Sequence, residues 1–416
     1  MTRPLRVALL AHEFLINIGA NDFLKNIIRG LALQEQNEII FLCPRGENRI
    51  EHQVPTAAKA ALKKNPVVEA ILRGVLRQAR QARAKVVKPD PGPYSFYRDA
   101  CPWMRFIETD LDVESLRRLK VEHQIDVFLP SIHILPGDLP YVTYWPDCQP
   151  KHYPEFFDDE SQRVRDERIN GLFATGKPMI INSRDAKSDM VRFYNANPDQ
   201  IFELPFAPII EFDRLTPHPE LARPYGLTKP YFMVCNQFWV HKSIETVIEA
   251  AAIAKKRKLD IEIVFTGKMQ EPRRPQYITM LREMVIKNDL GDIVRFLDYI
   301  PKNDQLELMR SAIAVIQPTL FEGGPGGGSI YDAVSLGVRA IASDIPINHE
   351  LPLDPDRLVL FKKRNAKDLV DKMQKMMAAP NRAPSFEDLY QQSKESARKL
   401  STRLYQAIDY AISQDG

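Results

Sequence analysis

Short, almost continuously apolar runs alternate with longer amphipathic segments along the first half of this chain. The apolar runs predict strands over 5–11, 39–43, 125–130, 141–145, 179–182 and 201–204. The segments with helical spacing predict helices over 22–33, 111–124, 161–174 and 184–194. Ser183 precedes the last of these helices as its N-cap. Buried strands joined by helices are typical of a doubly wound α/β domain with a parallel sheet.

The same alternation begins again at residue 231. Apolar runs predict strands over 231–235, 261–267, 294–297, 312–317, 339–343 and 358–361. Helical spacing predicts helices over 243–258, 276–288, 302–311, 330–336, 366–377 and 386–412. The residues between the two halves are rich in proline and lack strong periodicity, which predicts a linker. We therefore expect an N-terminal domain, an interdomain linker, a second domain and a C-terminal helix, over 1–205, 206–230, 231–385 and 386–416.

Composition restricts the function classes. The chain has 416 residues, of which 44% are hydrophobic and 27% charged, as in ordinary globular proteins. A net charge of +3, without aromatic residues interleaved among basic ones, argues against a nucleic-acid partner. The four cysteines are far apart, which favours neither a zinc site nor a disulfide framework. We find no signal peptide and no run of about 18 apolar residues, so we expect a cytoplasmic protein.

One segment, 59–88, is strongly basic. It holds nine lysines and arginines against a single acidic residue, Glu69. If it is helical, apolar residues share one face, and Arg73, Arg77 and Arg80 lie opposite. Two interpretations stay open. The segment is either a solvated helix face or a basic surface that contacts anionic lipid headgroups at the inner face of a membrane.

A glycine-rich stretch follows the strand that ends at Gln317. We call residues 323–328 the glycine turn; its glycines are Gly323, Gly324, Gly326, Gly327 and Gly328. Glycine lets the backbone approach a ligand closely, and a helix start offers free N–H groups to an anion. Two carboxylates flank this turn and suit the hydroxyls of a sugar or a ribose, so the pattern indicates a nucleotide attached to a sugar. The alternative is a flexible loop that caps a helix.

Two commoner glycine motifs do not fit. A P-loop needs a lysine after its last glycine, and here Ser329 and Ile330 follow Gly328. A dinucleotide fingerprint is expected at the first strand of the chain, whereas the glycine turn lies beyond residue 320.

The stretches 318–328, 332–338 and 342–346 resemble the donor-binding segment of retaining glycosyltransferases of family 4, also called group 1. This resemblance implies the GT-B fold, in which two Rossmann-like domains face each other across a cleft and a C-terminal helix crosses back to the N-terminal domain. In the family, seven residues separate two glutamates. Here nine residues separate Glu322 from Asp332, so the loop is two residues longer and the second carboxylate is one methylene shorter.

The resemblance also implies the donor contacts. Family enzymes place an arginine and, five residues later, a lysine on the pyrophosphate; Lys242 matches the lysine, while Gln237 replaces the arginine. Extra backbone donors in the glycine turn, next to Ser329, would offset the lost cation. By the same resemblance, Glu322 would contact the donor sugar and Asp332 the ribose. Three further donor-site candidates lie at the end of a predicted strand or in the loop or turn after one, namely Gly19, Gly267 and Tyr299.

The acceptor side is expected in residues 146–157, where polar residues crowd the end of a strand. This stretch resembles the family's acceptor loop, which carries a His-Asp pair. Aligned on Tyr-Pro-Glu, the family's aspartate falls on Asp147, but its histidine falls on Pro146. His152 either substitutes for that histidine or is an exposed loop residue. The catalytic candidates are therefore Asp147, His152 and Glu322.

The function that this resemblance implies is sugar transfer, with retention of configuration, from a GDP- or UDP-sugar to a glycan or lipid-linked glycan acceptor in cell-surface polysaccharide synthesis. The nucleoside diphosphate sugar is a substrate, and no metal or other cofactor is expected, because Lys242 and helix-end amides neutralise the diphosphate. Two alternatives stay open: a nucleotide-sugar epimerase or hydrolase on the same fold, and a non-catalytic binding subunit of a glycan assembly complex.

Overall fold

We describe the protein from a computed structural model, which places residues 3–12, 14, 18–44, 94–209 and 224–414. The basic segment 59–88 lies outside these described residues. Two compact units are present: residues 1–142 together with 411–416, and residues 143–410. The domain boundaries that we expect from the sequence, at 205 and 230, stay a prediction. Within the described ranges, no helix is long and apolar enough to cross a membrane.

Seven strands form the first sheet, in the order β3-β2-β1-β4-β5-β6-β7. They are β1 (Arg6–Leu10), β2 (Glu38–Pro44), β3 (Arg105–Thr109), β4 (Val127–Ser131), β5 (Tyr141–Tyr144), β6 (Met179–Ile181) and β7 (Ile201–Glu203). Parallel pairs join β1 to β2 and β4, β2 to β3, and β6 to β5 and β7. The described helices of this half are α1 (Ile18–Ala32), α5 (Ser95–Arg98), α6 (Val113–Glu122), α7 (Gln149–His152), α8 (Asp159–Ala174) and α9 (Arg184–Tyr194).

Six strands form the second sheet, in the order β10-β9-β8-β11-β12-β13. They are β8 (Tyr231–Cys235), β9 (Glu262–Thr266), β10 (Val294–Phe296), β11 (Ala314–Gln317), β12 (Ala340–Asp344) and β13 (Leu358–Lys362), and their pairs are parallel. The helices are α10 (Ile244–Lys256), α11 (Gln276–Lys287), α12 (Lys302–Ser311), α13 (Gly327–Ser335) and α14 (Ala366–Ala378). Two short 3-10 turns, η5 (Val240–Lys242) and η6 (Pro346–Glu350), lie after β8 and β12.

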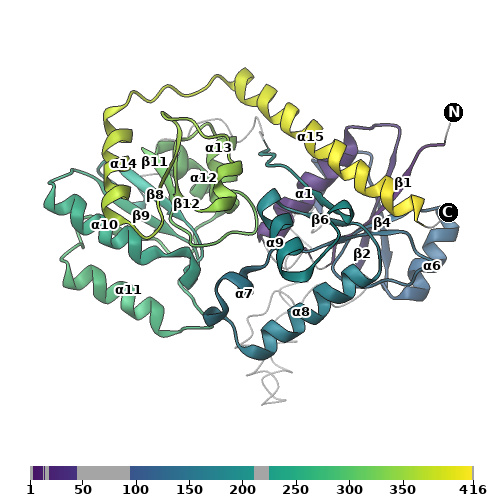
Figure 1. Cartoon of the computed structure of the whole chain (residues 1–416). Helices are drawn as coiled ribbons and strands as arrows, with labels where there is room; N and C mark the ends of the chain where they lie inside the picture. The colour runs from purple at the N-terminus through teal and green to yellow at the C-terminus, as the bar shows by residue number, and fades with distance from the viewer. Residues whose placement is uncertain (1–2, 13, 15–17, 45–93, 210–223, 415–416) are drawn as a thin grey trace, which may run out of the picture. The chain divides into compact units, whose positions relative to one another are not determined.

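The second sheet is covered on both faces. Successive residues of β8 alternate between two cores, because side chains of a strand point to opposite faces. Phe232 and Val234 join the core under α10 and α14, while Met233 joins the core under α12 and α13. Figure 1 shows these strands between the two pairs of helices. Nearly all side chains of β8, β9 and β11 are buried, which explains why they are continuous apolar runs in the sequence.

The last helix, α15 (Phe386–Ser413, yellow in Figure 1), contacts the first sheet. Arg403 forms an ion pair of 2.6 Å with Glu203 on β7. The Tyr410 ring lies 5.8 Å from the Phe202 ring on the same strand. The expected return of the C-terminal helix to the first sheet is therefore confirmed.

Three local expectations were wrong. Gly19 was expected in a loop, but α1 begins at Ile18, so Gly19 lies in its first turn. Similarly, α13 begins at Gly327 rather than at Ile330. Glycine has poor helix propensity, so a helix that starts with glycines is not visible from propensity. The third was an omission: β3 was not predicted. Four of its five side chains are exposed or half-buried, because β3 lies at the edge of the sheet and pairs with β2 alone among the described strands.

Gly267, at the end of β9, is a position that requires glycine. Its φ is +131°, which side-chain-bearing residues rarely adopt. A Cβ added there would lie 2.1 Å from the backbone oxygen of Asn236, at the end of the neighbouring strand β8. Glycine at this position therefore lets two strand ends approach closely, and this packing accounts for it without a ligand.

We predict that Gly267→Ala destabilises the protein by about 1–3 kcal/mol, because it adds both backbone strain and steric overlap. Urea unfolding at constant temperature measures the effect. The control is Gly291→Ala, where an added Cβ has nothing within 4 Å, and that change should stay within about 0.5 kcal/mol of the wild type. Equal stability of the two variants would contradict the packing explanation.

Candidate functional site

A buried ion pair lies at one edge of the second sheet. β8 and β11 are parallel neighbours, so η5 after β8 and the glycine turn after β11 meet at that edge. Lys242 Nζ pairs with Glu322 Oε1, and only 11% and 9% of these side chains are exposed. Gln317 Nε2, at the end of β11, donates to the same carboxylate oxygen. The Leu320 N–H donates to the His241 carbonyl oxygen at 2.7 Å, which ties the two segments together.

The glycine turn folds tightly around the Glu322 carboxylate. A Cβ on Gly327 would lie 2.8 Å from Glu322 Oε2, so any side chain there would displace the carboxylate. Gly326 has a φ of +68°, and a Cβ there would lie 2.4 Å from Ile330 Cβ. Its N–H donates to Asn348 Oδ1 at 2.8 Å, and Asn348 is fully buried. The turn is therefore held in one shape rather than being a flexible cap.

Two further glycines of the turn, Gly323 and Gly324, lie against residues that follow strands of the first sheet. A Cβ on Gly323 would lie 3.1 Å from Asp147 Oδ2, after β5. A Cβ on Gly324 would lie 3.5 Å from Asn182 Cβ, after β6, which is an ordinary contact. Gly328 has nothing within 4 Å of that position, so the start of α13 is open on that side.

Ser329 lies in the first turn of α13. Its hydroxyl is buried and has no hydrogen-bond partner within the described part of the chain. Buried hydroxyls in native proteins usually have a partner, so this one suits a ligand that supplies it. The first N–H group of the helix, at Gly327, already donates to the Gly324 carbonyl oxygen at 3.1 Å. The Ser329 hydroxyl and the other N–H groups of the first helical turn together suit an anion.

Asp332 lies in the second turn of α13 and pairs with Lys302, the first residue of α12. The Asp332 side chain is 20% exposed and the Lys302 side chain 39%. Burial and the Asp332 carboxylate raise the pKa of Cys235 to about 12, which places Asp332 near the end of β8. Sequence reasoning missed Lys302, because a lysine at a helix start is typical of an exposed residue.

Asp147 was predicted on the acceptor side, and the structure places it against the glycine turn. Its Oδ1 accepts a hydrogen bond of 2.9 Å from the Gln149 N–H. Burial raises the pKa of Asp147 above its ordinary value, and the negative Glu322 adds to this rise. The Gln149 N–H and the positive Arg165 partly oppose it. Asp147 and Glu322, predicted from distant stretches, therefore lie near each other.

His152 is the last residue of α7. Its Nε2 lies 2.6 Å from Oδ2 of Asp189, a buried residue of α9. The imidazole ring also lies 5.3 Å from the Phe321 ring, which directly precedes Glu322 in the chain. The hydrogen bond to Asp189 raises the pKa of His152 above its ordinary value. His152 is therefore a partly exposed but paired residue. Sequence reasoning missed Asp189, because 37 residues separate the two partners.

Four donor-site candidates have no contact in the structure that points to a ligand. Gly267 is explained by its contact with Asn236. Tyr299 is 60% exposed, and Gln237 is half-buried in the turn after β8. Gly19 lies in the first turn of α1. Their assignment to the donor stays a prediction.

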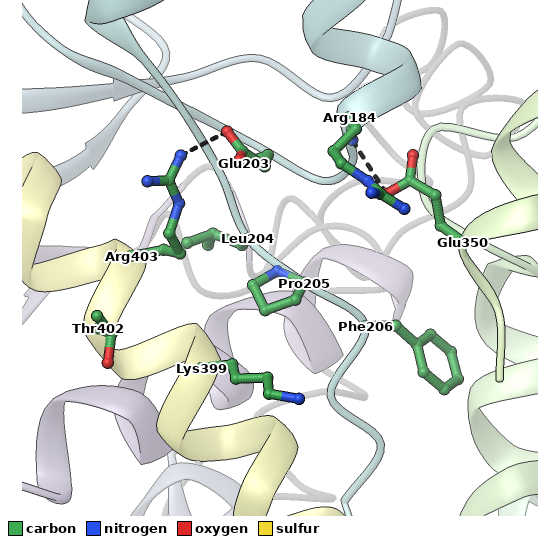
Figure 2. Close-up of a pocket in the computed structure, with 9 residues that line it drawn as sticks. All are labelled: Arg184, Glu203, Leu204, Pro205, Phe206, Glu350, Lys399, Thr402 and Arg403. Atoms are coloured by element: carbon green, nitrogen blue, oxygen red, sulfur yellow. Dashed lines mark hydrogen bonds and ion pairs between the residues drawn. The ribbon is translucent and has the colours of Figure 1, made fainter.

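A pocket of about 400 Å³ lies apart from these residues (Figure 2). Its lining residues are Arg184, Glu203, Leu204, Pro205, Phe206, Glu350, Lys399, Thr402 and Arg403. Figure 2 shows two ion pairs among them, Arg403 with Glu203 and Arg184 with Glu350. Glu350 also accepts hydrogen bonds of 3.1 and 2.9 Å from the backbone N–H groups of Arg184 and Asp185, at the start of α9. None of the residues that line this pocket is a site residue predicted from the sequence, so the glycine turn remains the candidate site.

The stretch that contains Lys242, Glu322 and the glycine turn also matches a known protein family. Residues 222–400 match the model of the family "Glycosyl transferases group 1". The O-antigen chain mannosyltransferase RfbU of Salmonella typhimurium is 30% identical over 125 residues, which are 29% of this chain and 31% of RfbU. The match thus spans less than a third of that relative's length.

Solved structures resemble the whole chain. Sucrose-phosphate synthase from Thermosynechococcus elongatus aligns over 99% of this chain and 97% of its own, with a TM-score of 0.58 and 13% identity. Anabaena Alr3699/HepE, in complex with UDP and glucose, aligns over 99% and 98%, with a TM-score of 0.55 and 12% identity. At such identities the likeness concerns the fold alone. The chain has the GT-B fold of two parallel Rossmann-like sheets, and the family match over 222–400 supports a glycosyltransferase of the group 1 type.

Proposed function

We propose that this chain is a retaining glycosyltransferase that moves a sugar from a nucleoside diphosphate sugar to a glycan or lipid-linked glycan acceptor. The observation that carries the proposal is the buried Lys242–Glu322 pair beside the glycine turn. It lies within the stretch that matches the group 1 family model. A cation, a carboxylate and open helical N–H groups in one place suit a ligand with both phosphates and hydroxyls.

The donor is proposed to be a UDP- or GDP-sugar, and the pathway cell-surface polysaccharide synthesis. The complex of HepE with UDP and glucose supports a uridine nucleotide. The name of RfbU, an O-antigen chain mannosyltransferase, supports the pathway. We also propose a cytoplasmic location and contact of the basic segment 59–88 with an anionic membrane. This segment lies outside the described residues.

In the proposed mechanism, donor binding exchanges the partners of the ion pair. Without ligand, Lys242 and Glu322 neutralise each other, which lets both stay buried. With the donor bound, Lys242, the N–H groups of α13 and the Ser329 hydroxyl hold the diphosphate. Glu322, still held by Gln317, accepts hydrogen bonds from the sugar hydroxyls. Asp332 takes the ribose hydroxyls.

The acceptor hydroxyl enters on the Asp147 side and attacks the anomeric carbon from the face that the diphosphate leaves. The bond from that carbon to the diphosphate oxygen breaks, and its electron pair stays on the diphosphate. The proton of the acceptor hydroxyl passes to the departing diphosphate oxygen as the new carbon–oxygen bond forms. Donors that already point at the developing charge stabilise it, by about 3–4 kcal/mol for each well-placed donor.

The direct test is incubation with UDP- and GDP-sugars in the presence and absence of glycan acceptors. We expect acceptor-dependent release of the nucleoside diphosphate and a product whose anomeric configuration, read by NMR coupling constants, equals that of the donor. Isomerisation of the sugar nucleotide without acceptor would instead indicate an epimerase. Tight binding without any turnover would indicate a binding subunit.

Three substitutions should separate the contacts to the nucleoside diphosphate from the contact to the sugar. Lys242→Met should weaken both the nucleoside diphosphate and the sugar nucleotide, by about 1.5–3 kcal/mol, because a charged hydrogen bond is lost. Glu322→Gln should weaken only the sugar nucleotide, since Lys242 keeps its place on the diphosphate. Asp332→Asn should weaken both ligands, because both carry the ribose. Isothermal titration calorimetry measures each affinity.

The matched control is Lys255→Met at the far end of α10, where Lys255 pairs with Asp289 and Asp292. It removes the same charge and should leave both affinities unchanged. If Lys242→Met behaves like this control, the diphosphate does not bind at Lys242.

The pairing of His152 predicts a pH dependence. Because the pKa of His152 is raised by Asp189, the pair contributes stability at pH values below about 6.5, and this contribution is lost as the pH rises through the raised pKa. Asp189→Asn should therefore lower the pKa of His152, which an NMR titration of the imidazole protons measures. It should also lower the melting temperature more at pH 6 than at pH 9.

The control is Asp185→Asn on the same helix, because Asp185 acts on His152 only through its charge and without a hydrogen bond. Its effect on the pKa of His152 should be smaller. An unchanged pKa in Asp189→Asn would show that the pair does not form in solution.

A further inference from the structure

Asn182 follows β6 and has a carboxamide whose orientation is fixed from one side. Its Nδ2 donates to the Tyr144 hydroxyl at 3.2 Å and to the Pro146 carbonyl oxygen at 3.4 Å. Both partners belong to the end of β5 and the residues after it. The amide nitrogen therefore faces β5, and Oδ1, on the other branch of the carboxamide, points away from these two partners.

That oxygen, Asn182 Oδ1, is buried and has no hydrogen-bond partner anywhere in the described part of the chain. A buried acceptor without a donor is rare in native proteins, since burial removes its water. If the carboxamide were turned over, Oδ1 could accept from the Tyr144 hydroxyl, but it would then face the Pro146 carbonyl oxygen, which can only accept. The Pro146 carbonyl oxygen therefore sets the orientation in which Nδ2 faces the end of β5. The hydrogen bonds of Nδ2 thus hold Asn182 Oδ1 in a position where it has no donor.

Other acceptors surround the same place. Two glycines of the glycine turn lie against Asp147 and Asn182. An added Cβ would lie 3.1 Å from Asp147 Oδ2 at Gly323 and 3.5 Å from Asn182 Cβ at Gly324. Glu322 is close enough to raise the pKa of Asp147. Oxygen acceptors that share a site repel an anion but suit a ligand that brings several O–H donors.

We propose that Asn182 Oδ1 and Asp147 form a hydroxyl-binding subsite that selects the sugar part of the ligand. This inference rests on the proposed function and extends it to a residue outside the predicted donor and acceptor sets. Each group accepts a hydrogen bond from a sugar hydroxyl. Gly323 and Gly324, which lie against Asp147 and Asn182, bring no side chain of their own that could compete for those donors. The hydroxyls belong either to the donor sugar or to an acceptor sugar.

The test compares ligands with and without a sugar on the same protein. Calorimetry would measure UDP against UDP-glucose and GDP against GDP-mannose on wild type, Asn182→Leu and Asn182→Ala. If the subsite holds the donor sugar, both variants should reduce the affinity for the sugar nucleotide about 3- to 10-fold while leaving that for the nucleotide alone unchanged. If it holds an acceptor sugar, the variants should instead weaken binding of methyl glucoside or methyl mannoside to the UDP or GDP complex by a similar factor.

Tyr144→Phe is the matched control, because it removes one hydrogen bond that orients Asn182 but leaves the acceptor oxygen in place. A purely structural role of Asn182 would lower the melting temperature in all three variants and leave every ratio of sugar-ligand to nucleotide affinity unchanged. That result overturns the inference while the proposed function stands. If the wild type binds neither nucleotide, the proposed function fails, and this inference fails with it.

Discussion

The buried ion pair between Lys242 and Glu322 is the interaction on which the candidate site depends. Removing one partner of a buried pair leaves an uncompensated charge, at a typical cost of about 3–5 kcal/mol. The adjacent strands β8 and β11 bring the two residues together, and Gln317 Nε2 donates a hydrogen bond to the Glu322 carboxylate. A pair that is neutral without ligand can be buried and yet still offer a cation to phosphate and a carboxylate to hydroxyls.

The glycine turn connects the Lys242–Glu322 pair to residues that follow strands β5 and β6 of the first sheet. Gly327 leaves room for the Glu322 carboxylate, and Gly323 leaves room for Asp147. Asn348 fixes the turn from the side of β12 through the Gly326 N–H. One backbone segment therefore contacts a group proposed to bind the donor and a group proposed to bind the acceptor, an arrangement that suits group transfer between two bound substrates.

Much of the fold could be predicted from the sequence, because buried parallel strands are apolar runs and caps such as Ser183 are local signals. Ser183 accepts from the Ala186 N–H at 3.0 Å, as its position before α9 suggested. The starts of α1 and α13 could not be predicted, because tertiary contacts override the low helix propensity of glycine. Lys302, Asp189 and the unpaired oxygen of Asn182 were missed for another reason: their significance depends on partners distant in sequence.

A thermal-shift series with UDP, GDP, ADP and dTDP on the wild-type protein tests the central claim most directly, namely that the Lys242–Glu322 site binds a nucleoside diphosphate. We expect at least one of the four to raise the melting temperature in a concentration-dependent way. A ligand present at 100 times its dissociation constant should stabilise the protein by about 2.7 kcal/mol, which such a measurement resolves easily. No shift with any of the four at millimolar concentration would contradict the claim.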